Sequence, residues 1–130
     1  MSHYTANLRD IEFCLFDLLG REKVMGTSLY SDVDRDTAMG MLEEVKRMCE
    51  NDLAASFVEG DRVGATLNKE TGNVTLPESF KKSYKAYVDG EWWRVDAPVE
   101  LGGMKIPPSV RWAIAEMVLG SNPAIHIYAS

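Results

Sequence analysis

The sequence predicts an all-α fold, a bundle of about five helices with at most a short β-hairpin near residues 64–76. Three observations lead to this class. Apolar residues recur at intervals of three and four along several segments, proline and glycine stand at the segment boundaries, and no long run alternates apolar with polar residues. The chain has 130 residues, of which 45% are hydrophobic and 26% charged, as in one ordinary globular domain.

The first helix is expected over residues 8–19, with Asn7 as its N-cap and Gly20 as its end. Its apolar stripe consists of Leu8, Ile11, Leu15, Leu18 and Leu19. At 100° per residue, Phe13 and Phe16 project from a second face, so we expect them to be available for contacts with another domain or subunit.

The second helix is expected over residues 34–57, with Asp34 or Asp36 accepting the free N–H groups of its first turn. Its apolar stripe consists of Ala38, Met41, Leu42, Val45, Met48, Cys49, Leu53 and Phe57. The acidic residues from Asp32 to Glu43 have part of the spacing of a calcium-binding loop, but Thr37 stands where the sharp turn needs glycine. The pattern therefore favours an acidic helix N-terminus over a calcium site.

A hairpin with its turn at Thr71-Gly72-Asn73 is the most regular structure that residues 64–76 can form. Pro77 suits the first turn of a third helix over residues 77–88. Residues 90–104 form a loop in which Trp92 and Trp93 either anchor the chain on the core or contact a flat ligand. Gly102-Gly103 indicates a positive φ or a very close approach of another group.

The fourth helix follows Pro107-Pro108 and ends at Gly120, and it is apolar almost all round, with Arg111 and Glu116 as its only charges. Such a helix belongs inside a larger protein or an oligomer. Asn122-Pro123 begins a fifth helix that reaches residue 130 without a C-terminal cap. We therefore expect the chain to be the first piece of a longer protein.

Charge and composition narrow the partners. The chain has 14 Lys+Arg and 20 Asp+Glu, a net charge of −6, which argues against nucleic acid or an anionic membrane. The N-terminus lacks the features of a signal peptide, and no apolar run is long enough to span a bilayer. We expect a cytoplasmic protein without a membrane span.

The candidate chemistry is sparse. Cys14 and Cys49 lie among apolar neighbours and are predicted to be buried, reduced thiols. His126 either packs on its helix or lines a ligand cavity, and His3 is expected in a mobile terminus without a role. With no nucleophile at a recognisable spacing, no phosphate loop and too few ligands for a metal, the sequence predicts no catalytic residue and no metal site.

Four ordered motifs resemble the acyl-CoA dehydrogenase family. The stretch from Gly90 to Met104 is similar to the family's Gly-Trp turn and Pro-Glu-x-x-Gly-Gly loop, although Val99 replaces the Glu, and residues 116–124 resemble the helix junction that follows it. Residues 2–16, 56–62 and 76–82 resemble members with an extra N-terminal segment, the long mycobacterial type. The resemblance implies an extension helix in residues 1–26 and the family's N-terminal helical domain, incomplete at its C-terminus, in residues 27–130.

The resemblance implies a homo-oligomeric flavoenzyme of fatty acid β-oxidation that oxidises a fatty acyl-CoA to the trans-2-enoyl-CoA. FAD accepts the hydride, an electron-transfer acceptor reoxidises it, and a carboxylate removes the α-proton. The family's catalytic carboxylate and most FAD contacts lie beyond these residues, so the resemblance implies that this fragment binds no FAD and is inactive alone. By register it places Ile125, His126, Ala129 and Ser130 along the fatty-acyl chain. The alternative is a stand-alone helical interaction module that is derived from such a domain.

Overall fold

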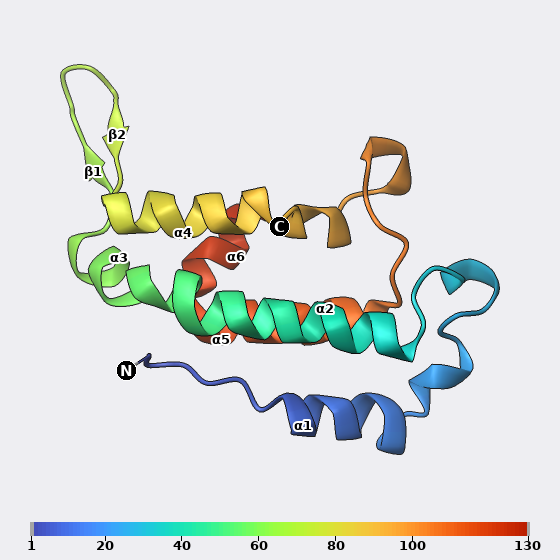
Figure 1. The fold of residues 1–130 in the computed structure, drawn as a ribbon. Helices are drawn as coiled ribbons and strands as arrows, with labels where there is room; N and C mark the ends of the chain where they lie inside the picture. The colour runs from blue at the N-terminus through green and yellow to red at the C-terminus, as the bar shows by residue number, and fades with distance from the viewer. Residues whose placement is uncertain (1, 130) are drawn as a thin grey trace.

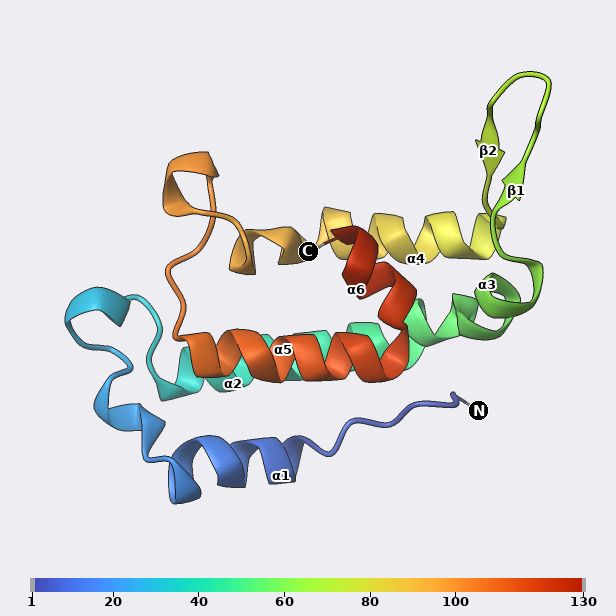
Figure 2. The ribbon, with the colours of Figure 1, turned by 180° about the vertical axis from the view of Figure 1, so that it is seen from behind.

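Helix α2 (Arg35–Met48) lies at the centre of the fold in a computed structural model that describes residues 2–129. Helix α5 (Pro108–Ser121) packs beside α2 and runs in the same direction, while α1 (Leu8–Glu12) and α4 (Glu78–Asp89) run in the opposite direction (Figure 1). The view from behind shows α6 (Pro123–Ala129) crossing from the end of α5 toward α4 (Figure 2). The all-α prediction, with one short hairpin, is confirmed.

The predicted second helix continues through three further segments: the π-helical η4 (Cys49–Leu53), the 3-10 turn η5 (Ala54–Ser56) and α3 (Phe57–Val63). Asp34 is its N-cap, because Asp34 Oδ1 accepts the N–H of Thr37 at 2.8 Å. The buried members of the predicted stripe, which include Leu42 and Val45, form the middle of the core.

The wide turn η4 is fixed by side chains from other helices. A π turn interrupts the regular ladder, so its carbonyl groups need other donors. Ser121 Oγ donates to the Cys49 carbonyl at 2.6 Å, Ser83 Oγ to the Asp52 carbonyl at 2.6 Å, and Asn122 Nδ2 to the Leu53 carbonyl at 3.1 Å. The turn therefore ties α4 and the end of α5 to the central helix.

The predicted first helix is present, but its second half is the π-helical segment η1 (Phe13–Leu18). A π helix has more residues per turn than an α-helix, which rotates the side chains that follow Phe13 away from the expected stripe. Leu18 and Leu19 are 67% and 56% exposed, whereas Phe16 is buried beneath the guanidinium of Arg35, 4.4 Å from the ring centroid. The prediction that Phe16 is available for outside contacts is wrong, while Phe13 is exposed.

Two short 3-10 turns, η2 (Arg21–Lys23) and η3 (Ser28–Tyr30), connect the first helix to α2. After α3, strands β1 (Thr66–Leu67) and β2 (Val74–Thr75) pair antiparallel in a hairpin that projects from the bundle (Figure 1). The predicted hairpin is confirmed, and Gly72 in its turn has φ +72°.

The loop before α5 contains the 3-10 turns η6 (Trp92–Val95) and η7 (Val99–Leu101). Both tryptophans are partly buried against the core, as the anchoring interpretation predicts. Gly102 has φ +86°, and a Cβ on Gly103 would lie 1.7 Å from the Ala97 carbonyl oxygen. Gly102 therefore has the positive φ, and Gly103 the close approach of another group, that the sequence indicated.

Neither thiol in the described chain forms a disulfide, but the two differ in exposure. Cys49 is buried, and burial raises its pKa to about 12. Cys14 is exposed, so the prediction of burial is wrong at that position, because Cys14 lies in the rotated π-helical segment. In residues 2–129, no helix is long and apolar enough to cross a membrane.

Candidate functional site

The residues predicted to line an acyl chain lie on α6. Ile125 is wholly buried in the core, Ala129 packs against the core at its edge, and His126 is half-buried. Ser130 lies outside the described residues. Three of the four predicted positions therefore share a helix, and two of these three are partly accessible.

The opposite face of α6 was not predicted as a site. Ala124, Ile127 and Tyr128 are exposed there, and the Tyr128 ring meets the Phe80 ring edge-on at 6.1 Å between centroids. A hollow of about 320 Å³ lies between α4 and α6 and is lined by Leu76, Phe80, Lys81, Tyr84 and Tyr128. Helical spacing places residues 124, 127 and 128 on a different face from residues 125 and 129, so this face could have been predicted from the sequence.

The position of α6 depends on Asn122. Its side-chain amide donates to the Leu53 carbonyl and to Ser56 Oγ, at 3.1 Å and 3.0 Å, and its carbonyl oxygen accepts the Ile125 N–H at 3.4 Å. Asn122 and Ser56 are both buried. The same residue thus caps α6 and attaches it to the central helix.

The N-terminal residues pass over the same corner as an extended segment, residues 2–7, that we call the strap. The His3 ring stacks on Phe57 with 4.4 Å between centroids, and its Nε2 is hydrogen-bonded to the Ser121 carbonyl at 2.9 Å. The expectation that His3 lies in a mobile terminus without a role is therefore wrong. The sequence could not show this, because the partners are 54 and 118 residues away (57 − 3 and 121 − 3).

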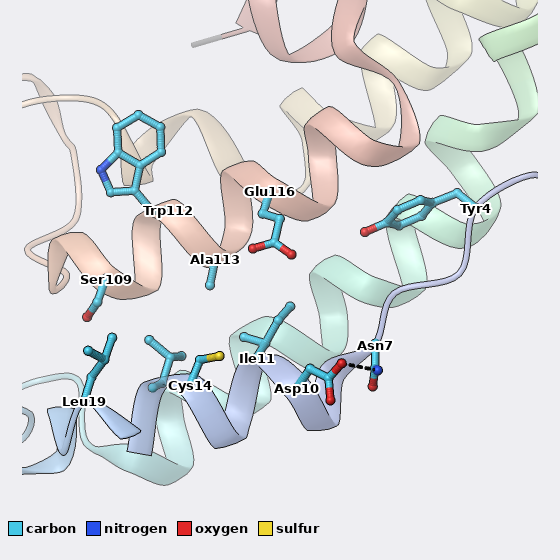
Figure 3. Close-up of a pocket in the computed structure, with 11 residues that line it drawn as sticks. Tyr4, Asn7, Asp10, Ile11, Cys14, Leu19, Ser109, Trp112, Ala113 and Glu116 are labelled. Atoms are coloured by element: carbon cyan, nitrogen blue, oxygen red, sulfur yellow. Dashed lines mark hydrogen bonds between the residues drawn. The ribbon is translucent and has the colours of Figure 1, made fainter. Parts of the chain in front are cut away.

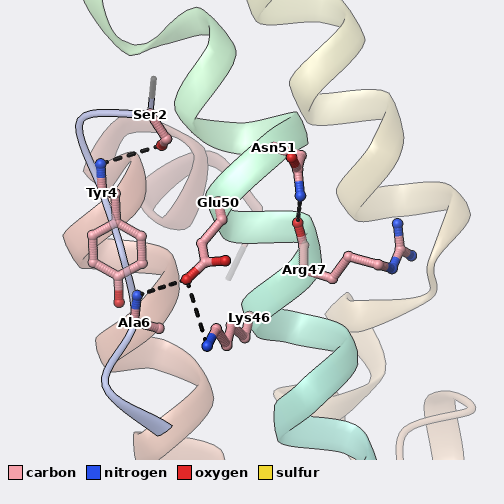
Figure 4. Close-up of polar contacts among 7 residues, drawn as sticks. All are labelled: Ser2, Tyr4, Ala6, Lys46, Arg47, Glu50 and Asn51. Atoms are coloured by element: carbon pink, nitrogen blue, oxygen red, sulfur yellow. Dashed lines mark hydrogen bonds and ion pairs between the residues drawn. The ribbon is translucent and has the colours of Figure 1, made fainter.

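Glu50 holds the middle of the strap, as Figure 4 shows. Glu50 Oε1 accepts the N–H of Ala6 at 3.0 Å and lies 3.8 Å from Lys46 Nζ. The Tyr4 ring lies on Gly120, where a Cβ would be 2.6 Å from Tyr4 Cε2. Mainly through burial, the pKa of Tyr4 rises to about 12, so its hydroxyl stays protonated at neutral pH.

A groove of about 370 Å³ runs between the first helix and α5 (Figure 3). Ile11, Leu15 and Ala113 are buried and form its floor. Its other lining residues include Tyr4, Asp10, Leu19, Trp112 and Glu116. No sequence pattern predicted this groove, because it depends on how the first helix and α5, which are far apart in the sequence, pack together.

Two curated proteins are similar to this chain. The broad-specificity linear acyl-CoA dehydrogenase FadE5 of Mycobacterium tuberculosis is 50% identical over 129 residues, which are 99% of this chain and 21% of FadE5. The 3-methylmercaptopropionyl-CoA dehydrogenase of Ruegeria pomeroyi is 38% identical over 115 residues, which are 88% of this chain and 19% of that protein.

The chain is therefore similar to one part of two acyl-CoA dehydrogenases. The resemblance drawn from the sequence motifs is thereby confirmed. No family model matches the chain. The chain spans about a fifth of the length of the curated relatives that it matches.

The described part of the chain offers two accessible surfaces: the outer face of α6 and the groove between the first helix and α5. Among residues 2–129, no group of three or more His, Cys, Asp or Glu side chains could hold a metal ion. Asp34, within the segment that resembles a calcium loop, is used as a helix cap. The accessible features of the site are an apolar helix face and a groove with an acidic end, which can exclude water and position an apolar group.

Proposed function

We propose that this chain forms the N-terminal helical part of an FAD-dependent acyl-CoA dehydrogenase that converts a fatty acyl-CoA to the trans-2-enoyl-CoA in β-oxidation. The observation that carries the proposal is the 50% identity to FadE5 over 99% of the chain. Such identity supports retention of the same helical arrangement in the same role. Residues 1–26 act as an extension and residues 27–130 as the helical domain.

In this proposal, α6 forms one wall of the acyl pocket. Ile125 fixes the helix in the core, while His126, Ala129 and Ser130 lie toward the acyl chain. Support comes from the partial exposure of His126 and Ala129, which leaves both side chains accessible at the surface of α6. An acyl chain needs such a wall, because burying its methylene groups supplies about 0.8 kcal/mol for each CH₂.

The resemblance places most FAD contacts and the catalytic carboxylate outside these 130 residues. The proposal therefore assigns FAD and the catalytic carboxylate to other parts of the enzyme. We also propose that the whole enzyme is a cytoplasmic homo-oligomer and that it passes its electrons to a separate acceptor. The isolated chain is proposed to be inactive.

Complementation tests the proposal. FadE5 lacking the segment homologous to this chain is co-expressed with the 130-residue chain, and the complex is assayed for flavin absorbance and for dye reduction with acyl-CoA substrates. We expect a yellow, active complex, whereas the chain alone is colourless and reduces no dye. The role of α6 is tested with Ala129→Phe, which should raise KM for long-chain acyl-CoA more than for short-chain acyl-CoA. Ala55→Phe, exposed on η5, is the control.

Two results would overturn the proposal. A yellow, active preparation of the chain alone would place the flavin site within these residues. A stable monomer that restores neither flavin nor activity to the shortened FadE5 would favour the stand-alone interaction module.

A further inference from the structure

We propose that the groove between the first helix and α5 docks an amphipathic helix of a partner protein, one that carries an apolar stripe and a basic residue at one end. This inference is independent of the proposed acyl pocket, since it concerns the other side of α5. It rests on the shape of the groove, the exposed apolar side chains at one end and the charges at the other.

The walls of the groove are two helical segments that run in opposite directions (Figure 1). Buried apolar side chains form the floor between them. Ridges of a third helix pack into this kind of depression between two helices.

One end of the groove is apolar. Trp112 on α5 is 63% exposed and Leu19 is 56% exposed, and both line the groove. Leu19 lies beside Ser109 (Figure 3). An exposed tryptophan that flanks an apolar depression is typical of residues that dominate binding energy at protein interfaces.

The other end is acidic. Among the described residues that line the groove, Asp10 and Glu116 are the only charged side chains, and both are carboxylates. The nearest cation to Trp112, Arg111, lies 5.7 Å from its ring centroid and is paired with Asp96, so its charge is already balanced. A basic residue on the occupant would complement this end.

Charge also argues against a second copy bound through the same groove. Two identical grooves facing each other either bring four carboxylates together or set each acidic end against the partner's apolar end, and neither arrangement supplies a basic residue for Asp10 and Glu116. The chain as a whole has a net charge of −6, which adds repulsion between two copies. The structure therefore favours a different, basic helix as the occupant.

Peptide binding to the full 130-residue chain tests the inference. The probe is a fluorescent, end-blocked helical peptide of Ala, Leu and Lys, with leucines along one face and two lysines near one end. A control peptide has the same sequence with glutamates in place of the two lysines. We expect the lysine peptide to bind at least about tenfold more tightly, with the difference shrinking as salt rises. Trp112→Ala should weaken binding about tenfold, while Leu101→Ala, which removes another exposed apolar residue, should not.

Charge reversal gives the sharper test. Glu116→Lys should abolish the preference, because the new cation offsets the remaining carboxylate of Asp10 and the two peptides then bind about equally. Glu43→Lys, an exposed change of the same charge on α2, should leave the preference intact. Circular dichroism verifies that each variant is folded. Equal binding of both peptides to the unsubstituted chain, unchanged preference in Glu116→Lys, or dimerisation that blocks the peptide would overturn the inference.

Discussion

Gly40 and Gly120 both lie inside helices, yet their surroundings differ. A Cβ on Gly40 in α2 would meet no atom of the described residues within 4 Å, and its φ is not positive. Gly40→Ala should therefore raise the free energy of unfolding by about 0.5–1 kcal/mol, because alanine has the higher helix propensity. Urea denaturation followed by circular dichroism measures this change.

Gly120→Ala should have the opposite effect. Its Cβ would lie 2.6 Å from Tyr4 Cε2, so the strap must move. We expect a loss of about 1–3 kcal/mol, the usual cost of overpacking. In a Tyr4→Ala background the obstacle is absent, so the same substitution should become neutral or stabilising. An equal loss in both backgrounds would mean that Tyr4 does not pack on Gly120.

Asp34 links helix capping to pH. Hydrogen bonding by Thr37, first through its side chain and then through its backbone, lowers the pKa of Asp34 below the ordinary value of 3.8. A carboxyl whose folded pKa is depressed stabilises the fold above its unfolded pKa and loses this effect as pH falls through the folded pKa. Asp34→Ala should therefore lower Tm at neutral pH, with the difference shrinking below about pH 3.8.

Asp36→Ala is the matched control for that change. Asp36 lies in the first turn of α2 but does not cap it. We expect a smaller change in Tm at neutral pH. Equal losses in the two variants would show that general charge near the helix end, rather than the cap, produces the effect.

At the scale of elements, Asn122 joins three segments: the wide turn η4, η5 and α6. Asn122→Ala leaves the Leu53 carbonyl without this side-chain donor and removes the cap of α6. Loss of a buried hydrogen-bonding partner costs about 1–3 kcal/mol. We expect that decrease in the free energy of unfolding, together with faster proteolysis within α6.

Asn51→Ala is the control for this element. Asn51 also donates its side-chain amide to a backbone carbonyl, that of Arg47 at 2.7 Å, but it is exposed to solvent. Water can replace that bond, so the change should stay within about 0.5 kcal/mol. Similar losses for Asn51→Ala and Asn122→Ala would contradict the special role of the buried contact.

Helical spacing was sufficient to predict which segments are helical, because the stripe around Leu42 and Val45 repeats over many turns. It could not predict the π-helical segments, since the burial of Phe16 and the exposure of Leu18 follow from a local change in residues per turn. The candidate positions on α6 came from a resemblance, whereas the groove beside Trp112 requires the three-dimensional placement of two helices.

At the scale of the molecule, α5 explains how an almost entirely apolar helix fits a chain of 130 residues. Five of its apolar residues are buried in the core: Val110, Ala113, Ile114, Met117 and Val118. Trp112 and Leu119 stay exposed, so one face of α5 still has apolar surface to cover. Only the face of α5 that carries Trp112 and Leu119 is therefore still expected to need a neighbouring segment.

The two thiols provide a test of the whole core. Cys14 is exposed, while Cys49 is buried at the centre with its pKa raised to about 12 by burial and by the charge of Glu50. Thiolates react with alkylating agents and neutral thiols hardly do so. At neutral pH we expect one rapid alkylation in the native chain, and none in a Cys14→Ser variant until denaturant unfolds it. Cys49 directly follows α2, and its backbone carbonyl accepts a hydrogen bond from Ser121 Oγ of α5. The rate at which the Cys49 thiol is labelled in Cys14→Ser should therefore follow global unfolding. Rapid reaction of Cys49 without denaturant, seen by mass spectrometry, would show that the core opens locally instead.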